Sequence, residues 1–306
     1  MHIPDGMMHG TICPVTAAVS AVGIACAAYY AHRSPQKPAP GRFATVAAFI
    51  FAAQMINFPI QAGTSGHLLG GILAVTLLGI PFGMLALALV VTIQCLLFSD
   101  GGITVLGANV LNMALVGTGC AGLLLKLSPP APARSFSFQR SVMVGSAAWC
   151  SIICAAFFCC LELAWSGTIS FRQVIGPMLG IHALIGVAEA GLTVLFWHLF
   201  AQHTALVKGG RAVTFPLLAS GIIGIMLVPF ASSYPDGLEW VAEQYRFLHE
   251  TAPAFVSPLP DYVIPGITNN IASGVGATLV GICCTFIAGL LCAYGIAASH
   301  SKKAVL

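Results

Sequence analysis

Long apolar segments separated by short polar stretches follow one another along the whole chain, and such a sequence folds stably only in a lipid bilayer. Charged residues make up 7% of the 306 residues, against about 25% in soluble domains. This composition disfavours a soluble enzyme and a nucleic-acid-binding protein. We predict an all-α, polytopic membrane protein with about nine transmembrane helices, near residues 11–31, 43–57, 67–80, 82–98, 105–126, 142–165, 173–200, 215–230 and 271–298.

The distribution of charge predicts how these helices cross the membrane. If the amino terminus lies outside, ten of the 12 Lys and Arg residues fall on inner loops, and none of the nine acidic residues does. By the positive-inside rule, the carboxyl terminus is then cytoplasmic, in a multi-pass protein of the bacterial inner membrane. The third and fourth segments are short and meet at Ile80–Pro81, so a re-entrant hairpin is an alternative for this pair.

The amino terminus is itself a candidate metal-binding group. It shows no signal-peptide pattern, so we expect Met1 to be retained. A terminal dipeptide ending in His2 offers three nitrogens that can lie in one plane: the Met1 amine, the His2 backbone nitrogen and the His2 Nδ1. The fourth corner of a square must come from elsewhere in the chain, and Ni²⁺ and Cu²⁺ favour such coordination. The alternative is a chain end that binds nothing.

Several ordered blocks of sequence carry a family resemblance. They are MHIPDG at residues 1–6, QMINFPI at 54–60, GTSGHLLGG at 63–71, QCLLFSDGG at 94–102, GANVLNM at 107–113 and HALIGVAE at 182–189. With these blocks, the chain resembles the CbiM/NikM family, the substrate-capture (S) components of energy-coupling-factor (ECF) transporters for cobalt and nickel. PDGLE at 235–239 and PLPDY at 258–262 resemble the small CbiN/NikN accessory component, here fused to the first part.

The resemblance implies a ligand set, a cargo and partners. It implies a metal-capture domain of about seven helices at residues 1–203 and a two-helix accessory part at 212–306. The implied cargo is Ni²⁺, with Co²⁺ as the alternative, and the implied ligands are Met1, His2 and His67. The implied partners are a transmembrane coupling (T) protein and cytoplasmic ABC-type ATPase subunits. The chain has no P-loop motif of its own, so we expect a transporter component and not an enzyme.

Polar residues near the apolar segments are candidates for orienting the ligands. They are Asn57, Ser65, Asp100, Asn109 and Asn112, with His182 and Glu189 as further candidates on one helix face. Hydrogen bonding that only builds the helix bundle is the alternative for the residues within the segments. For Asp100, the alternative role is to form the turn before Gly101 and Gly102.

Two stripes of alanine, at 17, 21 and 25 and at 44, 48 and 52, are spaced for close helix packing. The family resemblance implies that one such stripe docks the coupling protein, and internal packing is the alternative. Two rival functions fit the sequence less well. A membrane-embedded metal/thiol oxidoreductase needs clustered ligands, yet the 11 cysteines form no CxxC pair. A passive channel needs weak, repeated sites instead of one chelate.

Overall fold

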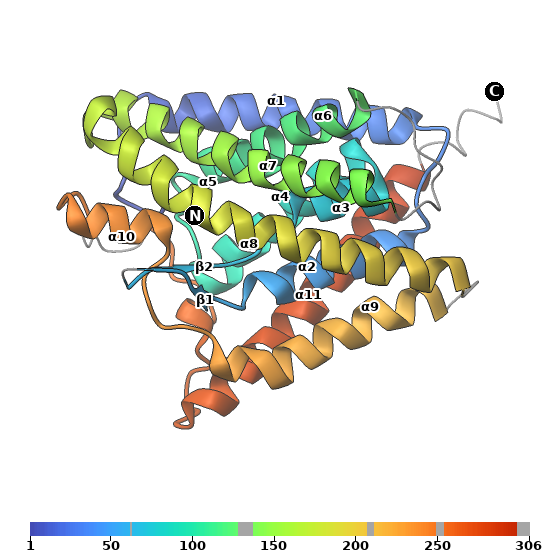
Figure 1. Cartoon of the computed structure of the whole chain (residues 1–306). Coiled ribbons are helices and arrows are strands. Elements are labelled where there is room, and N and C mark those ends of the chain that lie inside the picture. Colours follow the sequence, from blue (N-terminus) through green and yellow to red (C-terminus); the bar gives the residue numbers. More distant parts are fainter. Residues whose placement is uncertain (62, 128–136, 207–210, 249–253, 299–306) are drawn as a thin grey trace.

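The computed structural model describes residues 1–61, 63–127, 137–206, 211–248 and 254–298, and these are mostly helical (Figure 1). By length and composition, seven helices in these ranges can cross a membrane: Ile12–Arg33, Ile80–Phe98, Leu106–Leu127, Phe138–Trp165, Phe171–Phe200, Val213–Phe230 and Asn270–Ala297. They confirm the predicted all-α, polytopic membrane fold. The number of crossings and their orientation remain predictions.

Five of the long helices are regular: α1 (Ile12–Arg33), α4 (Ile80–Phe98), α7 (Phe138–Trp165), α8 (Phe171–Leu206) and α11 (Asn270–Ala298). The other two are composite. One consists of α5 (Leu106–Asn109), the π-helix η1 (Val110–Cys120) and α6 (Ala121–Leu127). The other consists of α9 (Arg211–Ile222), η2 (Ile223–Leu227) and η3 (Val228–Phe230). Hydropathy predicts each composite as one segment because it responds to apolar character and not to the type of helical turn.

Helix α2 (Pro40–Gln54) lies inside the bundle. Every residue from Phe43 to Gln54 is buried, because α11, α9 and α4 pack around the helix. The contact with α11 is close, since Gly281 leaves room for the Phe51 ring. With 15 residues, α2 is about 22 Å long, which is less than the roughly 30 Å of bilayer hydrocarbon.

The two alanine stripes lie in different surroundings. The stripe that starts at Ala44 on α2 is fully buried, and Gly289 of α11 packs against that first alanine. This stripe therefore serves packing within the bundle. The stripe that starts at Ala17 on α1 is exposed along its length. Of the two, only the α1 stripe is open to a partner in the membrane.

Helices α3 (Gly71–Leu78) and α4 form a hairpin. They pack against each other on either side of Gly79, whose φ of 87° suits glycine. Gly83 on α4 permits a close approach to Val75 on α3. Because α3 has only 8 residues, the helical part of the predicted segment at 67–80 is shorter than expected. Its first residues form a turn instead.

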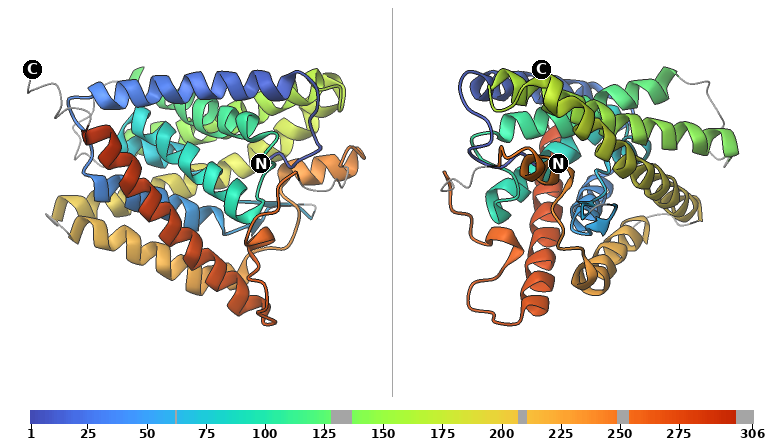
Figure 2. Two further views of the ribbon diagram at one scale, coloured as in Figure 1. Left: turned by 180° about the vertical axis from the view of Figure 1, so that it is seen from behind. Right: turned by 60° about the vertical axis from the view of Figure 1, so that its left-hand side comes forward.

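One end of the bundle carries the non-helical elements and the amino terminus (Figures 1 and 2). The antiparallel strands β1 (Phe58–Pro59) and β2 (Ser65–Gly66) lie there with the short helices α10 (Gly237–Gln244) and η4 (Pro260–Tyr262). Helix α1 begins at this end, so Arg33 at its last turn lies about 33 Å away along the helix axis. Helix α7 ends near the amino terminus. Arg140, in the first turn of α7, therefore also lies at the far end of the bundle.

Candidate metal site

The amino-terminal segment is threaded into the bundle. Met1, His2 and Ile3 are 8%, 8% and 1% exposed. The Asn109 side chain binds both backbone groups of Ile3: Ile3 N–H donates to Asn109 Oδ1 at 2.8 Å, and Asn109 Nδ2 donates to Ile3 O at 3.0 Å. Gly102 N–H also donates to Ile3 O, at 2.9 Å. These bonds fix the position of the first three residues.

Loops from other parts of the chain hold the residues that follow. Asp5 Oδ1 accepts hydrogen bonds from the backbone N–H of Thr104 at 3.0 Å and from its hydroxyl at 2.6 Å. His9 N–H donates to Ser166 Oγ at 3.0 Å, in the loop between α7 and α8. The His9 side chain is exposed. The segment is therefore tethered along most of its length.

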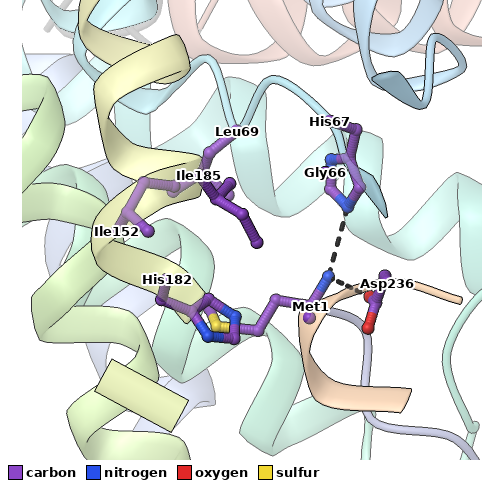
Figure 3. A pocket seen from close by; sticks show the side chains of 9 residues that line it. Met1, Gly66, His67, Leu69, Ile152, His182, Ile185 and Asp236 are labelled. Atoms are coloured by element: carbon purple, nitrogen blue, oxygen red, sulfur yellow. Dashed lines mark hydrogen bonds and ion pairs between the residues drawn. The ribbon is translucent and has the colours of Figure 1, made fainter. Parts of the chain in front are cut away.

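Two side chains meet at the Met1 amine (Figure 3). His67 Nε2 lies 3.2 Å from the amine nitrogen, and Asp236 Oδ2 lies 2.5 Å from it. His67 belongs to the turn between β2 and α3, and Asp236 is the N-cap of α10. Two ligands at right angles on one metal ion, each about 2 Å from it, are about 2.8 Å apart. The Met1–His67 separation is close to that value, with a proton between the two nitrogens.

The state of the His67 ring follows from its other nitrogen. Nδ1 lies 3.0 Å from Leu68 O, and because a carbonyl only accepts, Nδ1 carries the hydrogen. Nε2 therefore presents its lone pair to the Met1 amine. Burial, reinforced by the Met1 ammonium, lowers the pKa of His67 to about 3, so the ring is neutral at physiological pH. Metal-binding imidazoles commonly have one nitrogen bonded to a carbonyl in this way.

The His2 ring lies parallel to the His67 ring, with centroids 5.6 Å apart and planes at 19°. His2 Nε2 lies 3.2 Å from Gln94 Oε1, and His2 Nδ1 lies 3.0 Å from Asp100 Oδ1. Nδ1 is thus directed at a carboxylate. For Nδ1 to join a planar chelate, it has to give up its contact with Asp100 and bind the metal ion instead.

Charge and burial set the protonation of the Met1–Asp236 pair. Burial lowers the pKa of the Met1 amine, but the nearby carboxylates, Asp236 foremost, together outweigh burial and hold that pKa above its ordinary value. Burial raises the pKa of Asp236, and the Met1 ammonium more than reverses this, so that pKa lies below its ordinary range. Burial also lowers the pKa of His2. At neutral pH the site holds an ion pair beside two neutral imidazoles.

A small cavity adjoins the Met1–His67 contact (Figure 3). Its free volume of about 20 Å³ has room for one water molecule or one ion. His182 lines this cavity, and its Nδ1 donates to Met178 O at 2.8 Å. Its buried Nε2 therefore carries a lone pair, for which the described part of the chain provides no hydrogen-bond partner.

Backbone contacts join the accessory part to the strand that leads to the histidine turn. The N–H of Ser65 donates to Pro235 O at 2.8 Å, and its hydroxyl donates to Tyr234 O at 2.7 Å. Ser232 N–H donates to Asn57 O at 2.7 Å. Ser65 thus places the accessory segment beside the site, whereas Asn57 contributes through its backbone carbonyl.

The structure brings the three predicted ligands together, and two further side chains, which were not among the predicted site residues, contact them. Gln94 and Asp236 bind His2 and Met1, and the only signal for either is its presence in a conspicuous sequence block. Asn112 lies elsewhere, where its Nδ2 donates to Glu162 at 2.6 Å. Among the described residues, no three His, Cys, Asp or Glu side chains cluster as metal ligands.

Replacing Asn109 with leucine tests how far the site depends on its tether. The variant keeps the size of the side chain but removes both hydrogen bonds to Ile3, so the chain end loses its fixed position. We expect nickel affinity to fall by about 10- to 100-fold, the usual effect of losing a group that orients ligands. Isothermal titration of the purified chain measures this change. The exposed Asn270→Leu variant is the control, and wild-type affinity in Asn109→Leu would refute the role of the tether.

Comparison with known proteins identifies relatives of both parts of the chain. Residues 2–206 match the family CbiM, described as the cobalt uptake substrate-specific transmembrane region, and residues 211–298 match the PDGLE domain. A protein of Archaeoglobus fulgidus named for fused nickel transport (NikMN) is 35% identical over 292 residues, which are 92% of this chain and 95% of the relative. The cobalt transport protein CbiM of Acetohalobium arabaticum is 32% identical over 183 residues, covering 55% of this chain and 69% of that one.

A solved structure has a similar fold. The crystal structure of a truncated transition metal transporter superposes with a TM-score of 0.58 at 28% sequence identity. The match covers 66% of this chain and 99% of the solved one.

Proposed function

Because the chain belongs to the CbiM family, with a PDGLE domain fused behind it, we propose that it captures Ni²⁺ from outside the cell as the substrate-binding component of an uptake transporter. Its relatives carry the names of nickel and cobalt transport proteins. One observation supports this function most directly. The Met1 amine is buried at 3.2 Å from a neutral imidazole nitrogen whose lone pair faces it.

We propose that four nitrogens hold the ion. The Met1 amine, the His2 backbone nitrogen and His2 Nδ1 form two fused chelate rings, and His67 Nε2 completes the square. A proton lies between the Met1 amine and His67, and Asp100 lies at His2 Nδ1. Loading replaces both with one ion. The amine proton leaves, and the amide nitrogen of His2 also loses its proton.

The ligand chemistry favours Ni²⁺ over Co²⁺ as the cargo. Square-planar nitrogen coordination suits Ni²⁺ and Cu²⁺, and the long match to a relative named for fused nickel transport points the same way. Co²⁺ bound by the same groups is the alternative. Metal analysis of the chain expressed with both ions in the medium decides between them: bound nickel in excess supports the proposal, and bound cobalt in excess supports the alternative.

We propose that transport is powered by separate subunits, as in energy-coupling-factor transporters. In this account a transmembrane coupling protein and cytoplasmic ATPases bind the capture protein, which itself hydrolyses no ATP. The exposed stripe that starts at Ala17 on α1 supports docking there, since small residues allow helices to approach closely in lipid. The first part, at 1–203, holds the ion, and the accessory part, at 212–306, supplies Asp236 to the chain end.

Nickel affinity should fall steeply in acid. Asp236 holds the pKa of the Met1 amine above its ordinary value, so the amine is protonated at neutral pH and must lose that proton to bind. The amide loses a second proton. Each proton released costs about tenfold in affinity per unit of pH, so we expect roughly a 100-fold loss from pH 8 to pH 7. The two imidazoles add little, because burial keeps both neutral in this range.

Asp236→Asn tests the source of this pH dependence. Without the carboxylate, the largest influence that raises the pKa of the amine is gone, and burial is opposed only by Asp100 and Glu239, so the pKa of the amine falls and less of the amine carries a proton. We expect the pH dependence of the variant to be shallower, close to the one proton of the amide. Nickel titrations at pH 6, 7 and 8 measure both proteins. Equal slopes would contradict the role given to Asp236, and a wild-type affinity independent of pH would contradict the chelate.

A further inference from the structure

A buried glutamate in the long helix α8 binds the turn that carries His67. Glu189 is 0% exposed, and its two oxygens accept hydrogen bonds from neighbouring backbone groups. Leu69 N–H donates to Oε2 at 2.6 Å, and Gly70 N–H donates to Oε1 at 2.9 Å. Both donors lie within three residues of His67, at the start of α3. Ionisable groups inside a membrane bundle are costly, and they usually mark function.

The turn is also held from the side of α2. Gln54 Nε2 donates to Leu69 O at 2.8 Å, so the peptide groups on both sides of this residue are bonded to buried side chains. Gly70 has a φ of 78°, which suits glycine, and it lies close to Ile50 of α2. The conformation of the turn is thus specified by side chains from two helices. Glu189 provides the only carboxyl group that bonds to the turn's backbone in the described part of the chain.

We propose that Glu189 is a positioning residue for metal capture, which acts by fixing the turn so that His67 Nε2 faces the Met1 amine. This inference rests on the proposed function, because it assumes that His67 supplies the fourth ligand. A carboxylate offers one oxygen to each of the two N–H groups, whereas an amide of the same size has only one oxygen and places an NH₂ group at the other position. These two hydrogen bonds hold the backbone at Leu69 and Gly70, just after His67, in place. The imidazole, bonded in turn to Leu68 O, is then aimed at the chain end.

Glu189→Gln tests the role of the carboxylate with little change in shape. The amide retains one acceptor oxygen but places an NH₂ group against the second backbone N–H, which disturbs the turn. Glu162→Gln is a matched control, since Glu162 is also buried in a long helix, at 4% exposure, but it bonds to Asn112 and not to the site. Both variants remove one carboxylate from the bundle interior.

The readout is the visible absorption spectrum and affinity of the nickel-loaded, purified full-length chain. In Glu189→Gln we expect the ion to keep the three nitrogens of Met1 and His2 but to lose the nitrogen of His67. The absorption band of bound Ni²⁺ should then move to longer wavelength, which is also the shift expected for His67→Ala. Affinity should fall by about 10- to 100-fold. The double variant should bind no more weakly than His67→Ala alone, because the two changes remove the same ligand. Glu162→Gln should match the wild type.

The outcomes separate this inference from the proposed function. If the wild type has a tight planar site that His67→Ala weakens, while Glu189→Gln keeps wild-type affinity and spectrum, the inference is wrong and the function stands. Fully additive losses in the double variant would also overturn it. If the wild type has no such site, the proposed function itself fails. Should Glu189→Gln not fold, Glu189→Asp gives the same test, because its shorter side chain cannot reach both N–H groups and should produce the same shift in part.

Discussion

Two extra residues placed ahead of Met1 should abolish tight nickel binding. The extension moves the chain's free amine out of a space where Met1 is 8% exposed and bonded to Asp236, and the nitrogen of Met1 becomes an ordinary amide. A four-ligand metal site is worth about 10–16 kcal/mol, or about 3 kcal/mol for each ligand. Losing the amine and its fused amide ring together costs about 6 kcal/mol, or roughly 10,000-fold in affinity. Isothermal titration with Ni²⁺ measures the loss.

The length of the extension matters for this experiment. One added residue would place the histidine third in the chain, where the peptide alone supplies four nitrogens to the ion. Two added residues avoid that artefact. The same two residues added to the carboxyl terminus serve as the control and should leave binding unchanged. Undiminished affinity in the amino-terminal extension would refute the amine ligand.

The second large effect is expected for His67→Ala. The substitution removes one nitrogen of four, worth about 3 kcal/mol, so affinity should fall by roughly 100-fold. Water or chloride would take the open corner, and the absorption band of bound Ni²⁺ should move to longer wavelength. Nickel titration followed by visible spectroscopy detects both changes. Exposed His9, which also lies near the chain end, provides the matched control as His9→Ala and should retain the wild-type spectrum. An unchanged spectrum in His67→Ala would remove that residue from the site.

Much of the fold is predictable from hydropathy, because lipid imposes a simple rule on sequence. Long apolar segments must be helical in a bilayer, where every backbone group has to be bonded internally. The exceptions are short or composite elements. Helix α2 is buried by its neighbours and not by lipid, and the segment at 67–80 is helical only over α3. Tertiary packing decides both cases, and a scan of local hydropathy does not include it.

The site is predictable in part, and for a physical reason. The amine and the His2 nitrogens are neighbours in sequence, so the possibility of a chelate can be predicted from two residues. Asp236, by contrast, reaches the amine from 235 residues away, through a capped helix whose position depends on how the accessory part packs. Gln94 lies within an apolar helix and has no local feature that pairs it with His2. Contacts of this kind follow from the fold alone.

The orientation of the His2 ring is a further result that the sequence could not supply. A chelate drawn from covalent geometry places Nδ1 in the plane of the amine, but in the structure Nδ1 lies 3.0 Å from Asp100 Oδ1. The ring is stacked on His67 instead of meeting it edge to edge. In the proposed chelate, this ring therefore turns away from Asp100 to bind the ion.

X-ray absorption at the nickel edge of the loaded, unextended chain tests the central claim most directly. The account predicts four nitrogen ligands in a square plane at about 2 Å, of which two are imidazoles, with no carboxylate oxygen bound to the metal. A six-coordinate, oxygen-rich shell would contradict it. That result would show that oxygen ligands hold the ion while the Met1 amine stays paired with the Asp236 carboxylate.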